Sequence, residues 1–404
     1  MAKDFVTIED VLQAEKNLAG LTTVTPLDLS TTFSKIAGCK MYLKLENMQK
    51  TGSFKVRGAA NCIANLTEEE RGHGVITASA GNHAQGVAMG ATRMQCKSTV
   101  VMPENAPLTK VEATRNYGAE VVLHGTNYDE SYAKALEIQA AQKQTFIHAF
   151  NNPYVIAGQG TIALEILKQN PDIKAIAAPI GGGGLLAGLA VAVKHLAPQV
   201  KVYGVQSSGA PSMFLSVNEG RIVETNDVNT IADGIAVKRP GDLTFDIINK
   251  YVDDVVVVKD DDITATMLMM LERCKLVVEG AGATALAAVL HGLLPYNDSV
   301  ASVISGGNID VNIISKIIEN GLIKAGRRVR LATDLVDRPG ELLKLITSIA
   351  DLRANIVYVF HEHVGRNLPI GHTKIEIDLE TRDSEHAKNI LFCLRKAGYR
   401  VELI

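Results

Sequence analysis

Tryptophan is absent from the 404-residue chain, and all aromatic residues together make up only 5% of it. Basic residues are not in surplus either, because 41 Lys and Arg stand against 44 Asp and Glu, a formal net charge of -3. Without aromatic platforms or a basic surface, the sequence argues against nucleic acid as a partner. The 47% hydrophobic and 21% charged residues are instead typical of soluble globular domains.

Cysteine is also scarce. The five cysteines are scattered and never form a C-x-x-C pair. This spacing fits neither a disulfide framework nor a zinc site, so we expect a reducing, cytoplasmic environment and no metal centre. The first residues, MAKDFVTIED, carry charges where a secretory signal would need an apolar core.

Long apolar runs are nearly missing too. The longest uncharged apolar stretch, Ala175 to Val193, contains Pro179 and four consecutive glycines. In lipid these residues would leave backbone groups without partners. The stretch therefore predicts a buried strand, a glycine turn and a helix, and we expect no membrane association.

Two patterns divide the chain. Over residues 1–320, short apolar runs bounded by Gly, Ser or Pro alternate with helix-length segments, which predicts an α/β catalytic domain around parallel sheet. We expect a smaller lobe over roughly 41–140. After a linker at 321–326, residues 327–404 follow the order β-α-β-β-α-β, the ferredoxin-like arrangement.

The first segment with candidate chemistry is TGSFKVRG. Lys55 opens a predicted helix beside Phe54 and just after Gly52 and Ser53. A partly desolvated lysine at a helix N-terminus has a depressed pKa and can act as an amine nucleophile. Taken alone, the segment is better explained by a solvated surface lysine, since most lysines are exposed.

The second segment is SAGNHAQG, which connects a predicted strand to an Ala-rich helix. Its small residues leave backbone N–H groups at the helix N-terminus available to a carboxylate or a phosphate. Asn82 could donate a hydrogen bond to a ring hydroxyl, and His83 could act as a base. The alternative is a polar turn in which both residues cap the helix.

The third segment is a run of four glycines after a predicted strand, in which Gly182, Gly184 and Ala187 match G-x-G-x-x-A. A dinucleotide site would need an acidic residue at the end of the next strand, but the chain has Gln206 followed by two serines there. The sequence therefore favours a cradle for a single phosphate over NAD. The fourth segment, SGGN, places the hydroxyl of Ser305 at a strand end.

In this order, the four segments resemble those of the fold-type II (tryptophan synthase β-like) pyridoxal-phosphate enzymes, and within them the threonine dehydratases. The resemblance extends from about residue 7 to residue 321. It implies a two-lobed catalytic domain, pyridoxal 5'-phosphate as cofactor, and conversion of L-threonine to 2-oxobutanoate and ammonia. L-Serine is the alternative substrate, and an amino-acid sensor without catalysis is the alternative outside enzymes.

The resemblance also implies roles for individual residues. Lys55 would bind the cofactor covalently beside Phe54, Asn82 would hydrogen-bond the ring hydroxyl, and Ser305 would face the pyridine nitrogen. The cofactor phosphate would lie on Gly181, Gly182, Gly183, Gly184 and Leu185. The substrate carboxylate would lie on Ser79, Ala80, Gly81, Asn82 and His83.

Two positions depart from relatives with other activities. Ala80 stands where serine racemases have a serine base, which favours elimination over racemisation. Gln206 and Ser212 stand where relatives that bind a divalent cation have carboxylates, so only a monovalent cation held by carbonyl groups remains open. Glu279 is expected near the cofactor ring.

Residues 327–404 resemble an ACT regulatory domain through two motifs. These are Asp337-Arg338-Pro339-Gly340-Glu341-Leu342 and Ala354-Asn355-Ile356. The resemblance implies an allosteric site for isoleucine or valine. The first motif would bind the carboxylate of this amino acid, and Asn355 would bind its amino group across a subunit interface. We expect a homo-oligomer, a dimer or tetramer, because an open ferredoxin-like sheet needs a partner. The sequence leaves open whether the enzyme serves isoleucine biosynthesis or threonine catabolism.

Overall fold

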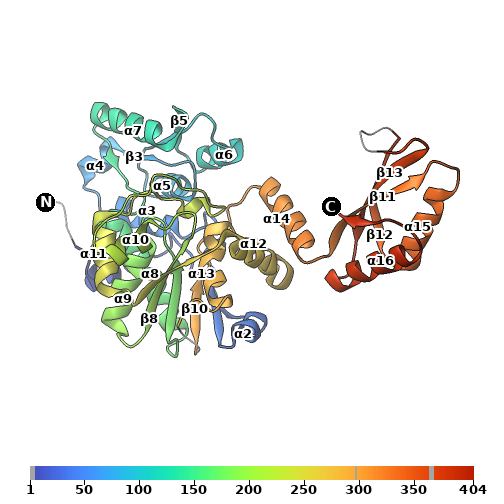
Figure 1. Cartoon of the computed structure of the whole chain (residues 1–404). Coiled ribbons are helices and arrows are strands. Elements are labelled where there is room, and N and C mark those ends of the chain that lie inside the picture. Colours follow the sequence, from blue (N-terminus) through green and yellow to red (C-terminus); the bar gives the residue numbers. More distant parts are fainter. Residues whose placement is uncertain (1–4, 296–297, 364–367) are drawn as a thin grey trace. The chain divides into compact units, whose positions relative to one another are not determined.

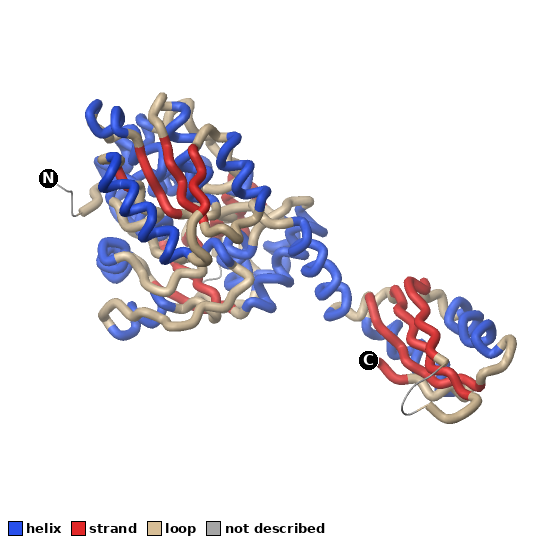
Figure 2. The backbone as a smooth tube through the Cα atoms, turned by 90° about the horizontal axis from the view of Figure 1, so that it is seen from above, coloured by secondary structure: helices blue, strands red, loops and turns tan. Residues whose placement is uncertain are grey.

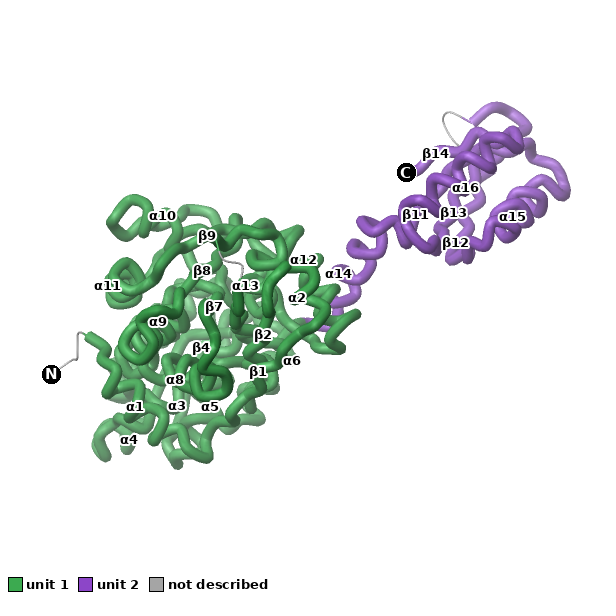
Figure 3. The backbone as a smooth tube through the Cα atoms, turned by 90° about the horizontal axis from the view of Figure 1, so that it is seen from below, with its two compact units in different colours: residues 1–309 green, residues 310–404 purple. Residues whose placement is uncertain are grey.

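The structure is a computed structural model that describes residues 5–295, 298–363 and 368–404. The chain divides into two compact units, residues 1–309 and residues 310–404, and each is described by itself (Figure 3). Within the described ranges, no helix combines the length and the hydropathy that crossing a bilayer requires.

A six-stranded sheet in the order β1-β2-β10-β7-β8-β9 forms the centre of the first unit (Figure 1). All its neighbouring strands pair in parallel except β1 with β2. Helices flank the strands (Figure 2), so a central strand such as β7 is buried at every residue. The strands are β1 Leu27–Leu29, β2 Met41–Lys44, β7 Ala175–Pro179, β8 Lys201–Ser207, β9 Asp254–Val258 and β10 Val300–Val303.

A four-stranded parallel sheet in the order β5-β4-β3-β6 forms the smaller lobe. Its strands are β3 Val75–Ala78, β4 Ser98–Met102, β5 Glu120–Leu123 and β6 Thr145–Phe146. The lobe expected over residues 41–140 thus has its own sheet between Val75 and Phe146. Residues 41–44 instead form β2 of the large sheet.

The helices of the first unit differ in how they start. Whereas α1 begins at a capping box formed by Thr7 and Asp10, α3, α5 and α9 have no side-chain cap. Their first-turn N–H groups therefore lack the side-chain partner that usually satisfies them. The helices of the first unit are α1 Ile8–Asn17, α2 Thr31–Ala37, α3 Lys55–Ala64, α4 Glu68–His73, α5 Asn82–Arg93, α6 Leu108–Asn116, α7 Tyr128–Gln142, α8 Pro153–Gln169, α9 Gly184–Leu196, α10 Ser212–Glu219, α11 Asp242–Tyr251, α12 Asp260–Met269 and α13 Gly280–Leu290, with the short turns η1 Glu46–Met48, η2 Asp233–Ile235 and η3 Met270–Cys274.

The long apolar stretch of the sequence forms β7, the glycine turn and α9, as predicted. Helix α9 packs closely on α8, because a Cβ added to Gly188 would lie 2.3 Å from the carbonyl oxygen of Ile156. Both helices contribute to one hydrophobic cluster, together with side chains of β7 and β8. This packing fixes the start of α9 beside the strand ends.

The second unit has the predicted β-α-β-β-α-β order after an initial helix. Its four strands form an antiparallel sheet in the order β12-β13-β11-β14. Leu345 and Ile349 of one helix and Ile390 and Leu394 of the other pack with inward-facing strand residues into one core. The elements are α14 Val311–Lys324, β11 Arg328–Val336, α15 Glu341–Asp351, β12 Asn355–Glu362, β13 His372–Glu380, α16 Ser384–Lys396 and β14 Glu402–Leu403.

Candidate active site

The candidate site lies where strand ends of the two sheets of the first unit meet. Asn82, which follows β3 of the small sheet, donates a hydrogen bond from Nδ2 to Glu279 Oε1 at 2.8 Å. Asn308, which follows β10 of the large sheet, donates to Asn82 Oδ1 at 2.8 Å. The backbone N–H of Phe54 donates to the carbonyl oxygen of Ser305 at 3.1 Å. Three of the four predicted segments are therefore joined by direct hydrogen bonds.

Lys55 is the first residue of α3 and is half-buried. Its Nζ donates to the carbonyl oxygen of Ala149 at 3.3 Å and lies 5.4 Å from the centre of the Phe54 ring. Burial lowers the pKa of Lys55 to about 8, although the nearby carboxyl of Glu279 opposes the shift. An amine with this pKa is about one-tenth neutral at pH 7, so Lys55 can act as a nucleophile and a base.

The segment that follows β6 contacts the starts of three helices, and it was not predicted from the sequence. The carbonyl oxygen of Ile147 accepts from His83 at the start of α5, and that of Ala149 accepts from Lys55 at the start of α3. At the start of α9, the ring of Phe150 lies against Gly182, and the Cα, Cβ and carbonyl oxygen of Phe150 lie against Gly184. The available signal was the run HAFNN after a short strand, which is polar enough to line a site.

Two histidines near Lys55 stay neutral. His83 Nε2 contacts the carbonyl oxygen of Ile147 at 2.9 Å, and because a carbonyl only accepts, this nitrogen carries the hydrogen. Burial, followed by the charge of Lys55, lowers the pKa of His83 to about 3. The same causes lower the pKa of His148 to about 4. This environment argues against His83 as a base near neutral pH and leaves Lys55 as the better candidate.

A chain of amide hydrogen bonds fixes the orientation of Asn82. Asn308 Nδ2 donates to the carbonyl oxygen of Thr51 at 2.7 Å and to Asn82 Oδ1, so the oxygen of Asn82 must face Asn308. The Nδ2 group of Asn82 then faces Glu279 and keeps one hydrogen for a ligand. Burial, followed by the charge of Asp233, raises the pKa of Glu279 to about 8.

The glycine run forms a backbone cradle at the start of α9. Gly183 is the residue before the helix and has φ +98, a conformation that favours glycine. A Cβ added to Gly182 would lie 2.3 Å from the Phe150 ring. Thr244 Oγ1 donates to the carbonyl oxygen of Gly182 at 2.6 Å, and this hydrogen bond stabilises the turn. Gly181 and Leu185 continue the same turn on either side.

The loop that was expected to hold a carboxylate lies between β3 and α5. The N–H of Gly81 donates to Ser79 Oγ at 3.2 Å, and the side chain of Ala80 packs against apolar residues of α5 and β4. The first turn of α5 has no side-chain cap. Its N–H groups therefore suit an anionic ligand.

The expected regulatory residues of the second unit lie at opposite ends of its sheet. Val336, immediately before the motif Asp337 to Leu342, pairs with His372, whereas Asn355 pairs with Glu380 at the other end of β13. Asn355 Nδ2 also donates to Glu380 Oε2 at 2.8 Å. A single subunit therefore does not bring the motif and Asn355 together.

Comparison with known proteins agrees with this geometry. Residues 18–306 match the family model for pyridoxal-phosphate dependent enzymes, and the chain belongs to that family. Within it, the chain is 50% identical over 399 residues to an L-threonine ammonia-lyase of Thermotoga maritima, a match that covers 99% of this chain and 100% of that protein. The resemblance to threonine dehydratases of fold type II is therefore confirmed.

Solved structures extend the comparison. A threonine deaminase from Solanum lycopersicum is 39% identical with a TM-score of 0.73, and the match covers 77% of this chain and 88% of that chain. A maize serine racemase is 35% identical with a TM-score of 0.75, over 79% and 98% of the two chains. The two-lobed fold is thus shared by relatives with different named activities.

The residues present fit pyridoxal phosphate. Lys55 offers an amine of lowered pKa, Asn82 offers an amide hydrogen, and the cradle that begins at Gly182 offers N–H groups that no side chain covers. The uncapped starts of α3, α5 and α9 add positive dipole ends that favour the anionic groups of the cofactor and a substrate.

Cofactor-free protein is expected to capture pyridoxal phosphate faster as the pH rises through about 8, because only the neutral amine of Lys55 is nucleophilic. The neutral fraction grows from about 10% at pH 7 to about 90% at pH 9, so the rate should rise about tenfold. Stopped-flow absorbance measures it, with Nα-acetyl-lysine as the reference amine. A midpoint near that of free lysine would contradict the lowered pKa.

Proposed function

We propose that the protein is a pyridoxal-phosphate-dependent ammonia-lyase that converts L-threonine to 2-oxobutanoate and ammonia in the cytoplasm. The observation that carries the proposal is the half-buried amine of Lys55, with a pKa of about 8, at the uncapped start of α3. It donates to the segment after β6, which also contacts the uncapped starts of α5 and α9. The relatives named threonine ammonia-lyase and threonine deaminase support the choice of substrate.

In the proposed mechanism, bound pyridoxal phosphate supplies an electron sink that acidifies the α-carbon of the amino acid. Lys55 Nζ takes the α-proton, which its lowered pKa permits near neutral pH. The carbonyl oxygen of Ala149 then holds the resulting ammonium, since it accepts from Nζ at 3.3 Å. The loop Ser79 to His83 would bind the substrate carboxylate through its backbone N–H groups, and Asn82 Nδ2 would donate to the ring hydroxyl of the cofactor.

A steady-state assay of threonine against serine tests the substrate. One methyl group in an apolar pocket changes kcat/KM by about 10–200-fold. We expect 2-oxobutanoate from threonine and slower formation of pyruvate from serine. A larger kcat/KM for serine would favour serine dehydration. A protein that shows the visible absorbance of bound cofactor but turns over neither substrate would favour an amino-acid sensor.

Elimination without racemisation is a further expected outcome. Ala80 has no hydroxyl to return a proton to the opposite face of the substrate, so L-serine should give pyruvate with negligible D-serine. Chiral chromatography measures both products. Formation of D-serine at a rate comparable to that of pyruvate would contradict the role given to this position, and Ala80→Ser is the variant in which racemisation should first be detectable.

We also propose that the second unit is an ACT-like regulatory domain in a homo-oligomer. Because the motif from Asp337 to Leu342 and Asn355 lie at opposite ends of one sheet, an amino-acid site that uses both needs a second subunit. Isoleucine or valine bound there would change the affinity for threonine about 5–150-fold. Calorimetry on the full chain and on a chain ending at Gly326 tests this, and binding that survives truncation would leave the domain only a structural role.

A further inference from the structure

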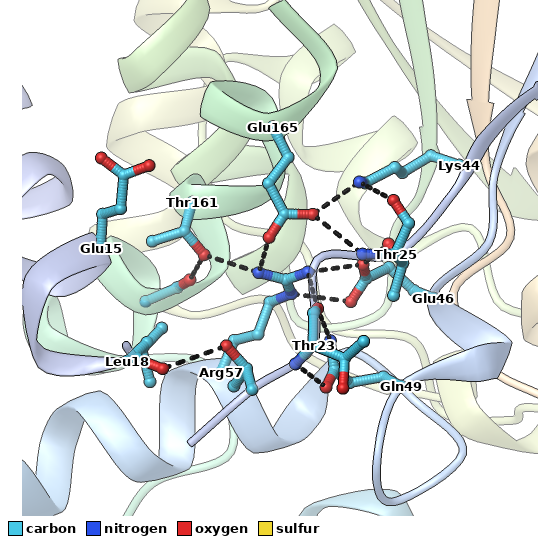
Figure 4. Close-up of polar contacts among 12 residues, drawn as sticks. Glu15, Leu18, Thr23, Thr25, Lys44, Glu46, Gln49, Arg57, Thr161 and Glu165 are labelled. Carbon is cyan, nitrogen blue, oxygen red and sulfur yellow. Dashed lines mark hydrogen bonds and ion pairs between the residues drawn. The ribbon is translucent and has the colours of Figure 1, made fainter. Parts of the chain in front are cut away.

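A cluster of four charged side chains lies inside the first unit (Figure 4). Arg57 and Lys44 are the cations, and Glu46 and Glu165 are the carboxylates. Each is at most 9% exposed. Each buried charge destabilises the fold by several kcal/mol unless it is paired and fully hydrogen-bonded, so the partners of these four side chains decide the effect of the cluster.

Every N–H donor of the two cations has an acceptor, either one of the two carboxylates or a neighbouring oxygen. Arg57 donates from Nε and Nη2 to the two oxygens of Glu46 at 2.8 Å each, and from Nη1 to Glu165 at 2.6 Å. Its remaining hydrogens reach Thr161 Oγ1 and the carbonyl oxygen of Thr23. Lys44 Nζ likewise donates to Glu165, to the carbonyl oxygen of Thr25 and to Gln169.

The cluster pairs two cations with two carboxylates, and this pairing affects the pKa of Glu46. Burial alone would raise the pKa of Glu46, but the charge and hydrogen bonds of Arg57 lower it overall. Glu46 is therefore held as an anion, and its two oxygens bind the guanidinium in a bidentate geometry that a lysine cannot reproduce.

The cluster is connected to the site through the first turn of α3. Arg57 is two residues after Lys55, in the same turn. Its partner Glu46 follows β2, whose Lys44 carbonyl accepts from the N–H of Ile304 at 2.9 Å, directly before Ser305. The Arg57–Glu46 pair therefore ties the turn that carries Lys55 to the strand end that carries Ser305.

The backbone of this turn packs closely against glycine residues of two neighbouring helices. A Cβ added to Gly86 of α5 would lie 3.0 Å from the N of Val56, and one added to Gly158 of α8 would lie 2.6 Å from the carbonyl oxygen of Arg57. A side chain of α8 also contacts the turn, since Gln159 accepts a hydrogen bond from its backbone. The hydrogen bonds of Arg57 add a defined direction to this close packing.

We propose that Arg57 is a positioning residue for Lys55, which fixes the distance and direction of its amine relative to Ser305 through the buried charge cluster. The inference rests on the proposed role of Lys55 in binding the cofactor. A displacement of about 1 Å in a reacting group lowers kcat about 100-fold, so loss of the anchor should appear in catalysis as well as in stability.

The test compares Arg57→Lys with Lys44→Met in the holoenzyme. Both variants weaken the same cluster, but only Arg57 lies on α3, so Lys44→Met is the matched control. We expect Arg57→Lys to lower kcat about 100-fold with little change in KM, and Lys44→Met to lower kcat less than about threefold. The pH midpoint of the visible cofactor band should differ from that of the wild type in the Arg57 variant and equal it in the Lys44 variant.

Other outcomes would overturn the proposal. Equal losses of kcat in the two variants, or a lower unfolding temperature with an unchanged band and kcat in Arg57→Lys, would mean that the cluster is only structural. If Arg57→Lys does not fold, Glu46→Gln can replace it in the test. This variant removes the negative charge of the bidentate pair and should shift the pH midpoint of the same cofactor band. The band reports on Lys55 whatever the substrate, so a wild-type protein with a normal band and no threonine turnover would refute the proposed function alone.

Discussion

Replacing Lys55 by alanine is expected to abolish both the visible absorbance of the bound cofactor and the deamination of threonine, with the fold retained. The variant removes the only atom that the proposed mechanism uses as nucleophile and base, a role that contributes at least about 10²–10⁴-fold to the rate. The fold should survive because Nζ makes a single hydrogen bond, to the carbonyl oxygen of Ala149, among the contacts of the described residues. Absorbance, initial rates and circular dichroism measure the three expectations.

Lys35→Ala is a suitable control for this variant, because Lys35 is exposed and lies in the last turn of α2. It should keep both the band and the turnover. Retention of a normal band and near-normal turnover in Lys55→Ala would show that another amine binds the cofactor, and the proposed site would then be abandoned.

Gly183→Ala is expected to weaken cofactor binding about 10–100-fold. Gly183 has φ +98, and a Cβ there would lie 2.8 Å from Oγ1 of Thr244, which also holds the carbonyl oxygen of Gly182. Backbone strain of about 1–3 kcal/mol is relieved most easily by moving the turn, and this would misalign the N–H groups of the cradle. Fluorescence titration of cofactor-free protein with pyridoxal phosphate gives the dissociation constant.

Gly38→Ala separates backbone strain from the function of the cradle. Gly38 also has positive φ, +71, but its Cβ would meet no atom within 4 Å, and it ends α2 on the protein surface. It should lower the free energy of unfolding by about 1 kcal/mol without changing the dissociation constant. Equal affinity in the Gly183 variant and the wild type would rule out the glycine run as the phosphate cradle.

The fold could be predicted well where local signals and the global arrangement agree. Strand β7, the glycine turn and α9 follow directly from an apolar run broken by glycines, and the second unit follows from alternating strands and an amphipathic helix. The small lobe was less well defined, because β2 is near it in sequence but pairs with β10 from the far end of the unit. Pairing between distant strands has no local signature.

The site shows a similar division. Lys55 and Asn82 stand in motifs whose residue types express their chemistry, so the sequence could single them out. The contacts of Ile147 and Ala149 are made by carbonyl oxygens, which any residue provides. The buried position of Arg57 was also not expected, since charged residues are rarely buried and nothing in the sequence pairs it with Glu165.

Ala149 illustrates what a mutational scan of this protein would overlook. Its carbonyl oxygen accepts from Lys55 Nζ, and its side chain is already alanine, so an alanine scan skips the position. Comparison of related sequences has the same limit, because a peptide carbonyl is present whatever residue is encoded. The contribution becomes visible only when the backbone itself is edited. Semisynthesis with an ester in place of the Ala149–Phe150 amide would weaken this acceptor and leave every side chain unchanged.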